Sequence, residues 1–253
     1  MKGSKDAKEY ALKDLQTRDP EDIKRFKRDI RVLSRIDHPN VVRIYKWQLK
    51  GIPSLALGPW YVMEHLPGGS LYDYLRRTRI PEKRFTISQV ILPICVGLEY
   101  AYAQGIYHRD LKPSNLMFAD QEHSVIKIID WELGKATGRQ STTVTGTGGV
   151  GGTREYCAPE QWLGQVVDAR VDIFSLGVIM YEMLTGICPG VYDDLGRPLN
   201  VQSPSHYQPT IVTELDQIVM KAIQMDPANR FQSMGELIAA LRSLPPDQAN
   251  QGG

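Results

Sequence analysis

The stretch HRDLKPSN, at residues 108–115, places an aspartate, a lysine and an asparagine within six positions of the chain. Asp110 could hold a hydroxyl group, Lys112 a phosphate, and the amide oxygen of Asn115 a metal ion. Asp130 closes the apolar run VIKIID and could share that metal. Phosphoryl transfer requires this combination, because it depends on an oriented nucleophile and on neutralised charge at the transferred group. These residues therefore indicate a site for phosphoryl transfer.

A second stretch, TGTGGVGGT at residues 145–153, contains the spacing G-x-G-x-x-G that occurs in phosphate-binding loops. That spacing is weak evidence unless a strand precedes it and a helix or a suitable second strand follows. Here it lies after Asp130 and runs into TREYCAPE, which does not begin a helix. We therefore do not interpret it as the nucleotide-binding loop.

The composition of the 253 residues, 42% hydrophobic and 23% charged, is typical of a globular protein with a sizeable core. The 30 basic and 29 acidic residues nearly cancel, which argues against nucleic acid and anionic membranes as partners. Three separated cysteines without a C-x-x-C pair fit a reducing compartment. The charged N-terminus resembles no secretory signal, and no uncharged apolar run approaches about 20 residues. We therefore expect a cytoplasmic protein without a membrane span.

The first 65 residues predict the order strand, helix, strand, strand. Tyr10–Leu15 is a short apolar segment that predicts a strand. An Asp-Pro pair at 19–20 predicts a helix start, and apolar residues at three- and four-residue steps across 23–36 predict one amphipathic helix. Two strands rich in β-branched and aromatic residues follow, VVRIYKW at 41–47 and PWYVM at 59–63.

The remainder of the chain is predicted to be mainly helical. One helix spans roughly Ile87 to Gln104, and Pro93 inside it should cause a kink or a local break. The segment 171–186 is apolar nearly all round, which predicts a buried central helix. Two amphipathic helices end the chain, over 215–223 and 234–241, the second with a capping box of Ser233 and Glu236.

These motifs resemble those of the Ser/Thr protein kinase family, and most closely its bacterial, eukaryotic-like members. Residues 108–115 match every position of the family's catalytic loop, H-R-D-x-K-x-x-N. The triplet APE at 158–160 matches the end of its activation segment, and DIFSLG at 172–177 matches its central helix. The resemblance implies an α+β fold of two lobes, a small β-rich N-terminal lobe that lacks its first strands and a large, mainly helical C-terminal lobe.

The same resemblance divides the chain into three parts. Residues 1–66 correspond to a truncated small lobe with the hinge, and residues 67–243 to the large lobe with the catalytic loop and the activation segment. Residues 244–253 are expected to form a disordered tail or a linker. The chain could belong to a longer protein with further domains upstream or downstream.

By resemblance, Asp110 is the catalytic base that accepts the proton of the substrate hydroxyl. Lys112 steadies the γ-phosphate, and lysine here is typical of Ser/Thr rather than Tyr kinases. Asn115 and Asp130 would hold magnesium or manganese. The implied reaction transfers the γ-phosphate of ATP to a Ser or Thr hydroxyl of a protein substrate.

The stretch YALK at 10–13 resembles the V-A-I-K strand of the family, which implies that Lys13 contacts the α- and β-phosphates of ATP. The helix carboxylate that pairs with this lysine is normally Glu, and here the position falls on Asp29. Aspartate is one methylene shorter, so the pair would be longer or bridged by water unless the helix moves inward.

The stretch VMEHL at 62–66 resembles the segment that joins the lobes. By resemblance, Met63 guards the adenine pocket, and the backbone of Glu64 and Leu66 binds the adenine edge. The glycine pair at 68–69 fits a flexible link between the lobes.

The glycine-rich stretch falls, by resemblance, within the activation segment. Thr145 and Thr147 occupy positions at which bacterial relatives carry activating phosphothreonines, and Arg109 is the expected cation that receives the phosphate. The hydroxyl of Thr153 is expected near the catalytic aspartate and lysine.

Two structural contacts of the large lobe are also implied by the resemblance. Glu160 should form a buried ion pair with Arg230, and Asp172 should anchor the catalytic loop.

Besides Asp29, two further departures from the family pattern stand out. Only twelve residues precede Lys13, and none of them forms the glycine-rich phosphate loop, so the chain is either a fragment or evolved without it. The metal-binding triplet D-F-G is replaced by Asp130-Trp131-Glu132. Trp131 can fill an apolar slot as phenylalanine would. Glu132 replaces a glycine that tolerates unusual backbone angles, and its charge could lie near the metal or point to solvent.

Three functions remain open on this evidence. The first is a Ser/Thr protein kinase. The second is a pseudokinase, a scaffold or inactive fragment that binds nucleotide weakly or not at all, which the missing loop and the D-W-E triplet favour. The third is a small-molecule phosphotransferase. The APE triplet and the long loop before it argue against the third, because they form a docking surface for a polypeptide.

Overall fold

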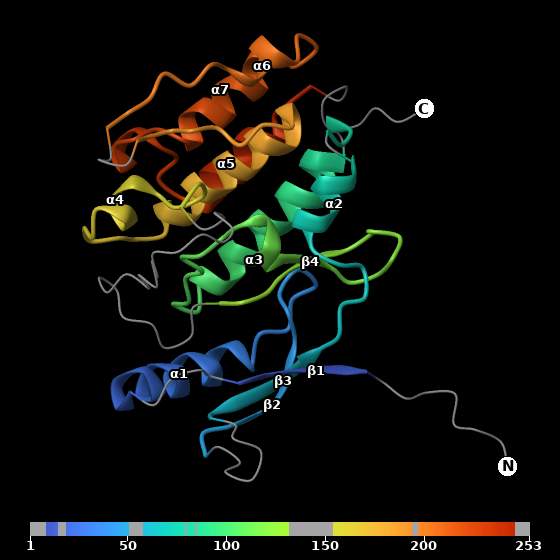
Figure 1. Cartoon of the computed structure of the whole chain (residues 1–253), viewed down its shortest axis with the longest axis vertical. Helices are drawn as coiled ribbons and strands as arrows, with labels where there is room; N and C mark the ends of the chain where they lie inside the picture. The colour runs from blue at the N-terminus through green and yellow to red at the C-terminus, as the bar shows by residue number, and fades with distance from the viewer. Residues whose placement is uncertain are drawn as a thin grey trace, which may run out of the picture.

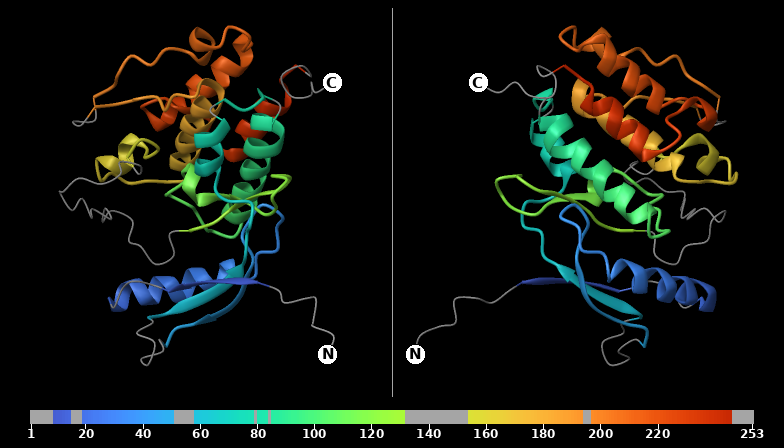
Figure 2. Two further views of the ribbon diagram at one scale, coloured as in Figure 1. Left: turned by 45° about the vertical axis from the view of Figure 1, so that its right-hand side comes forward. Right: turned by 180° about the vertical axis from the view of Figure 1, so that it is seen from behind.

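The computed structural model describes residues 9–14, 19–50, 58–78, 80–83, 85–131, 154–193 and 197–245, but not the side chains of Asp22, Arg25 and Asp29. One helix and three strands lie together at one end of the molecule, apart from the remaining helices (Figures 1 and 2). We call these two groups the small and the large lobe. The arrangement confirms the predicted α+β fold of two lobes, whereas the domain boundaries stay a prediction.

The small lobe contains an antiparallel sheet in the order β1 (Tyr10–Asp14), β3 (Trp60–Glu64), β2 (Ile44–Gln48). Strand β3 is central, and it pairs Lys13 of β1 with Tyr61. Strand β1 is an edge of this sheet, so its lysine is supported by hydrogen bonds of the sheet on one side.

Helix α1 (Pro20–Leu33) begins as the sequence predicts. The carboxylate of Asp19 accepts the backbone N–H of Glu21 at 2.9 Å, and proline occupies the first helical position. Phe26 and Ile30 on its apolar face are fully buried, and the ring of Phe26 lies 6.2 Å from that of Tyr61. The helix is therefore held on the sheet by the predicted apolar face.

The predicted strand over 41–47 is wrong at its start. Strand β2 begins at Ile44, because the residues before it pair with the other lobe instead. Val41 forms an isolated parallel bridge with Ile128, and the N–H of Val42 donates to the carbonyl of Ile128 at 3.0 Å. This segment therefore joins the end of α1 to the large lobe.

The large lobe has helices α2 (Leu71–Thr78), α3 (Leu92–Tyr102), α4 (Pro159–Trp162), α5 (Arg170–Thr185), α6 (Pro204–Tyr207), α7 (Thr213–Ala222) and α8 (Met234–Arg242). A π-helix (Phe85–Ile91) precedes α3, and short 3₁₀ turns cover Pro113–Asn115 and Pro227–Asn229. Strands β4 (Leu116–Phe118) and β5 (Ile126–Ile128) form a two-stranded antiparallel sheet. In the chain these two strands lie between Asn115 and Asp130.

The predicted helix over 87–104 is wrong in its bounds, whereas the predicted local break is present. Its first part, Phe85–Ile91, is a π-helix, and the α-helical part ends at Tyr102. Pro93 lies just inside α3 and provides no N–H for an α-helical hydrogen bond to the preceding turn. A π-helical segment before the proline accommodates this loss, and it is the break that the sequence predicts.

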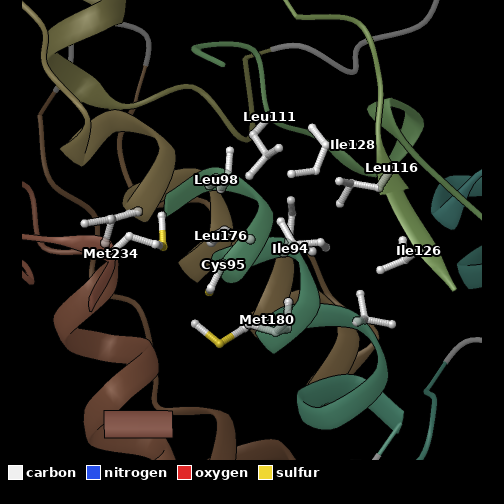
Figure 3. Close-up of a cluster of buried hydrophobic side chains, with 14 of the residues drawn as sticks. Ile94, Cys95, Leu98, Leu111, Leu116, Ile126, Ile128, Leu176, Met180 and Met234 are labelled. Carbon is white, nitrogen blue, oxygen red and sulfur yellow. The ribbon is translucent and has the colours of Figure 1, made fainter. Parts of the chain in front are cut away.

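The core of the large lobe lies between α3, α5, α8 and the two strands β4 and β5 (Figure 3). Figure 3 shows Ile94 and Leu98 of α3 between Leu176 of α5 and Ile128 of β5. All four side chains are fully buried. Helix α5 is buried on nearly every side, which confirms the predicted central helix.

The continuous helical stretch Phe85–Tyr102 is, among the described residues, the one long and apolar enough to cross a membrane by length and composition. Its mean hydropathy is 1.3, and half of it is buried inside the fold. In this structure it forms the core contacts with α5 and α8 (Figure 3).

The link between the lobes, residues 65–70, is hydrogen-bonded to strand β4. Gly68 donates its N–H to the carbonyl of Phe118, and Phe118 donates to the carbonyl of Gly69. A Cβ at Gly68 would lie 2.1 Å from the carbonyl oxygen of Asp120. Gly69 has a φ of 78°. The two glycines, expected as a flexible link, therefore serve close backbone approach and a left-handed turn.

The predicted capping box of α8 forms only in part. The hydroxyl of Ser233 accepts the N–H of Glu236 at 3.1 Å, as predicted. The carboxylate of Glu236, however, accepts the N–H of Gln232 at 2.9 Å, one residue before the expected donor. The helix start is correct, and the reciprocal bond is shifted by one residue.

Candidate active site

The side chains of Lys112 and Asn115 both contact the carboxylate of Asp110. Oδ2 of Asp110 lies 2.9 Å from Nζ of Lys112 and accepts Nδ2 of Asn115 at 3.2 Å. The same Nδ2 donates to the carbonyl of Asp110 at 2.7 Å. The amide nitrogen of Asn115 is thus used within the loop, which leaves its amide oxygen as the group for a metal. The structure brings these three predicted residues together.

The carboxylate of Asp172, in the first turn of α5, holds the loop at 108–115 through hydrogen bonds to its backbone. Its Oδ1 accepts the N–H of Arg109 at 2.7 Å, and its Oδ2 accepts the N–H of His108 at 3.0 Å. The hydroxyl of Tyr102 donates to the same Oδ2 at 2.7 Å. Asp172 is fully buried, and charge-assisted hydrogen bonds compensate for its burial. This arrangement confirms the predicted anchor of the loop.

Tyr102 contributes to this anchor and was not predicted from the sequence. Burial and the nearby Asp172 carboxylate raise the pKa of the Tyr102 hydroxyl well above its ordinary value. The phenol therefore stays protonated and remains a donor to Asp172. No periodicity or spacing connects Tyr102 with Asp172 in the sequence, because the two residues lie 70 positions apart.

His108 is fully buried and links the loop to the chain that leads to Asp130. Its Nε2 lies 2.8 Å from the carbonyl of Ile129, and its Nδ1 accepts the N–H of Asp110 at 3.3 Å. An Nδ1 that accepts requires a neutral ring that donates through Nε2. His108 is therefore structural, as expected.

Asn115 and Asp130 are also connected through the backbone. The N–H of Ile129 donates to the carbonyl of Asn115 at 2.9 Å, directly before Asp130. Asp130 itself has a φ of 60°, which is uncommon for a residue other than glycine. The strand β5 and this turn therefore present the Asp130 carboxylate beside the catalytic loop.

The carboxylate of Asp130 forms an ion pair with Lys13 of β1, across the gap between the lobes. Both side chains are partly exposed, at 42% for Lys13 and 34% for Asp130. The sequence predicts Asp29 as the partner of Lys13. Asp29 lies in α1, but its side chain lies outside the described residues, so that pairing stays a prediction.

Trp131 fills an apolar slot, as the sequence predicts. It is 4% exposed, and its ring centroid lies 5.1 Å from that of His108. Its indole N–H is buried without a hydrogen-bond partner within the described part of the chain. The next residue, Glu132, lies outside the described residues.

The predicted adenine-binding residues occupy the end of β3 and the start of the link. Met63 pairs with Ala11 of β1, and Glu64 is the last residue of β3. Leu66 is 5% exposed. Met63 lies two positions from Tyr61, the cross-strand partner of Lys13, so Met63 and Lys13 are on the same face of the sheet and Glu64 is on the other.

Of the predicted regulatory residues, Thr145, Thr147 and Thr153 lie outside the described residues. Arg109 has a φ of 65°, and its guanidinium lies 5.5 Å from the ring centroid of Tyr107. Its Nε is buried and makes no hydrogen bond within the described residues. Arg109 therefore carries an unsatisfied donor next to Asp110 in the chain.

The predicted ion pair between Glu160 and Arg230 is present and buried. Two parallel hydrogen bonds of 2.7 and 2.8 Å join the guanidinium to the carboxylate. Gln161, which the sequence did not single out, connects the same region to the loop. Its amide donates to the carbonyl of Arg109 at 2.8 Å and accepts the N–H of Ala158 at 3.3 Å. The residues 158–161 are thereby fixed to the loop at 108–115.

The donor set suits magnesium or manganese rather than zinc. Within the described ranges, no three His, Cys, Asp or Glu side chains gather in a way suited to a metal ion. Asn115 and Asp130 offer hard oxygen donors. Magnesium typically uses one or two carboxylates and completes its shell with water and substrate phosphates. The residues therefore fit a metal that arrives with a phosphate ligand.

The structure also forms an open pocket of about 340 Å³ on the small lobe. It is lined by Ser34 of the α1 end, Trp60 of β3 and the residues 44–48 of β2. None of the residues predicted for phosphoryl transfer lines it, so this pocket is separate from the candidate active site.

The comparisons with known proteins agree with this geometry. The protein kinase domain family matches residues 1–239 of the chain. A probable serine/threonine-protein kinase of Streptomyces coelicolor is 35% identical over 244 residues, which cover 91% of this chain and 35% of that protein. Serine/threonine-protein kinase PknB of Mycolicibacterium smegmatis is 34% identical over 241 residues, which cover 92% of this chain and 37% of that protein.

A solved structure shares the fold. The crystal structure of Rad53 in complex with AMP-PNP matches 90% of this chain and 56% of that chain, with a TM-score of 0.71 and 24% sequence identity. The chain spans 35% and 37% of the length of the two bacterial relatives.

Proposed function

Because this chain belongs to the protein kinase family, whose domain matches residues 1–239, we propose that it transfers the γ-phosphate of ATP to Ser or Thr hydroxyls of a protein substrate. The observation that carries this proposal is the contact set of the Asp110 carboxylate with Lys112 and Asn115. A carboxylate, a cation and an amide oxygen held in one loop supply the orientation and charge neutralisation of phosphoryl transfer.

In the proposed reaction, the Asp110 carboxylate accepts the proton of the substrate hydroxyl. The hydroxyl oxygen bonds to the γ-phosphorus, the bond from that phosphorus to the β–γ bridging oxygen breaks, and ADP leaves. Lys112, 2.9 Å from the carboxylate, stabilises the negative charge of the transferred phosphoryl group. A magnesium or manganese ion, held by Asn115 and Asp130, supplies further positive charge at the phosphates when bound.

Lys13 has a second role in this proposal. It pairs with Asp130 in the structure, and it would contact the α- and β-phosphates of ATP when the nucleotide is bound. The backbone of Glu64 and Leu66 would bind the adenine edge, with Met63 at the back of the adenine pocket. Asp29 would pair with Lys13 from α1.

A pseudokinase is the second candidate. The observation that favours it is the ion pair of Asp130 with Lys13, which engages the carboxylate that a metal needs. The replacement of the family's D-F-G by D-W-E favours it as well. Such a protein would fold in the same way and bind Mg-ATP weakly or not at all.

Asp130→Asn separates the two candidates. We expect wild-type chain to show an ATP-dependent rise in melting temperature that requires magnesium, together with phosphate transfer to a generic protein substrate. Asn at this position removes the charged oxygen donor, so the magnesium-dependent part of the rise is lost and transfer falls at least about a hundredfold. The measurements are differential scanning fluorimetry and γ-phosphate incorporation.

The matched control is Asp37→Asn, an exposed carboxylate outside the cleft. It should leave both measurements unchanged. A wild type that shows neither the magnesium-dependent shift nor transfer above the Asp130→Asn background would support the pseudokinase.

Regulation by phosphorylation is the finer part of the proposal. A phosphate on Thr145 or Thr147 would bind Arg109, whose buried and unbonded Nε supports this role. Thr153 would place its hydroxyl near the catalytic loop.

We expect a Thr145→Ala/Thr147→Ala variant to lose about tenfold in transfer rate, because the ordering phosphate is absent. Phosphatase treatment of wild-type chain should produce the same loss. The control is Thr142→Ala/Thr143→Ala in the same stretch of sequence. A Thr145/Thr147 variant that keeps the full rate would refute this regulation.

A further inference from the structure

The carboxylate of Glu64 joins three chain segments where the two lobes meet. Its Oε1 lies 2.9 Å from Nζ of Lys127 and accepts the backbone N–H of Arg43 at 2.6 Å. Only 13% of the Lys127 side chain and 19% of the Glu64 side chain are exposed. Ion pairs shielded to this degree are screened less by water and salt than pairs on the open surface.

The three segments come from both ends of the proposed nucleotide site. Glu64 ends β3, where the adenine edge would bind. Lys127 is the middle residue of β5, three positions before Asp130. Arg43 lies directly before β2, and its carbonyl accepts the N–H of Glu64 at 3.0 Å. One carboxylate therefore connects the adenine end of the cleft with the strand that presents the metal-binding aspartate.

The remaining contacts between these segments do not depend on the ion pair. The side-chain amide of Asn40 donates to the carbonyl of Ile126 at 2.8 Å, and the backbone carbonyl of Asn40 accepts the N–H of Ile128 at 2.9 Å. Gly97 of α3 packs closely against Asn40, since a Cβ at Gly97 would lie 3.2 Å from the carbonyl oxygen of Asn40. Backbone pairing and close packing thus join the lobes without Lys127, and the ion pair is an additional tie.

Among the described residues, the ion pair of Lys127 is with the carboxylate of Glu64. The nearby imidazole of His38 has a lowered pKa, because it is partly buried and because the positive charge of Lys127 disfavours its protonation. Its Nδ1 accepts the N–H of Asn40 at 3.1 Å, which requires that this nitrogen carry no proton. A neutral imidazole does not compete with Lys127 for the Glu64 carboxylate.

We infer that Glu64 and Lys127 are positioning residues that set the distance between the adenine-binding backbone and Asp130, an inference that rests on the function proposed above. ATP must contact both ends of the cleft at once, so a fixed separation reduces the ordering that binding requires. Neither side chain contacts the reacting atoms; each acts through the strand that carries it. Loss of the pair weakens nucleotide binding more than it slows the chemical step.

The test is Lys127→Met, which removes the charge and keeps most of the stem. We expect the Kd of Mg-ATP by titration calorimetry, and the KM for ATP, to rise about tenfold, with kcat within about twofold of wild type. Lys127→Arg keeps the cation and should recover most of the affinity. Lys46→Met, an exposed lysine of the same small lobe, is the matched control and should leave Kd unchanged.

A mutant cycle with Glu64→Gln identifies the pair as the cause. Glutamine keeps an oxygen acceptor for the N–H of Arg43 and removes the charge. The Glu64→Gln/Lys127→Met variant should have a Kd no higher than the higher of the two single-variant values, because each change breaks the same interaction. A purely additive loss would contradict the inference.

The outcomes separate this inference from the proposed function. If Lys127→Met lowers the melting temperature without nucleotide but leaves the Kd and KM unchanged, the pair is only structural and the inference fails. If wild type binds Mg-ATP with the expected dependence on Lys127 but transfers no phosphate, the inference stands and the proposed activity fails. If wild type binds no Mg-ATP, the inference is overturned.

Discussion

Asp110→Asn should lower kcat for phosphate transfer about a thousandfold, while the Kd of Mg-ATP stays within about twofold of wild type. Asparagine has the size of aspartate and can still bond to Lys112 and Asn115, but it cannot accept the proton of the substrate hydroxyl. The loss therefore belongs to the chemical step. Steady-state kinetics and titration calorimetry on the same preparations measure the two quantities.

The matched control for this substitution is Asp120→Asn. Asp120 lies in the turn between β4 and β5, where its carboxylate accepts the backbone N–H and the hydroxyl of Ser124. It is a partly exposed carboxylate of the same lobe, and its replacement should leave kcat unchanged. Equal losses in the two variants would show that the effect does not come from the catalytic loop.

Arg230→Met should destabilise the chain by about 3–5 kcal/mol, because it leaves the Glu160 carboxylate buried and unpaired. The Arg230 side chain is fully buried and that of Glu160 is 7% exposed. Arg230 also donates to the carbonyls of Gln224 and Met225, at 2.7 and 3.0 Å, and these acceptors would lose their donor. Urea unfolding followed by circular dichroism measures the loss.

Two further variants test the cause of that loss. Glu160→Gln combined with Arg230→Met removes both charges and should recover part of the stability, since no buried charge is left unpaired. Arg197→Met breaks an ion pair with Asp193 in which the Arg197 side chain is 71% exposed, so it should cost less than about 1 kcal/mol. A loss for Arg230→Met as small as that for Arg197→Met would contradict the account of a buried pair.

Sequence reasoning was most successful where function is encoded within a short stretch. Asp110, Lys112 and Asn115 lie within one loop, so their convergence follows from local spacing, and the structure brings them together. The apolar character of 171–186 likewise predicted a central helix, because a helix that is apolar all round must be buried.

Long-range contacts were predictable only where the resemblance supplied them, as for Glu160 with Arg230. The pairs Tyr102–Asp172 and Glu64–Lys127 have no signature in spacing or periodicity, since each joins residues far apart in the chain. The error at 41–47 has the same origin. The residues Val41 and Val42 are β-branched, as is typical of a strand. In the structure they pair with Ile128 of the large lobe and do not extend β2.

The most direct test of the proposed function is transfer of labelled γ-phosphate from Mg-ATP to a protein such as casein, with the modified residues mapped by mass spectrometry. The account predicts that wild-type chain places phosphate on Ser and Thr residues in a magnesium-dependent reaction, and that Asp110→Asn does not. Incorporation by wild type that is no greater than that of Asp110→Asn would contradict it.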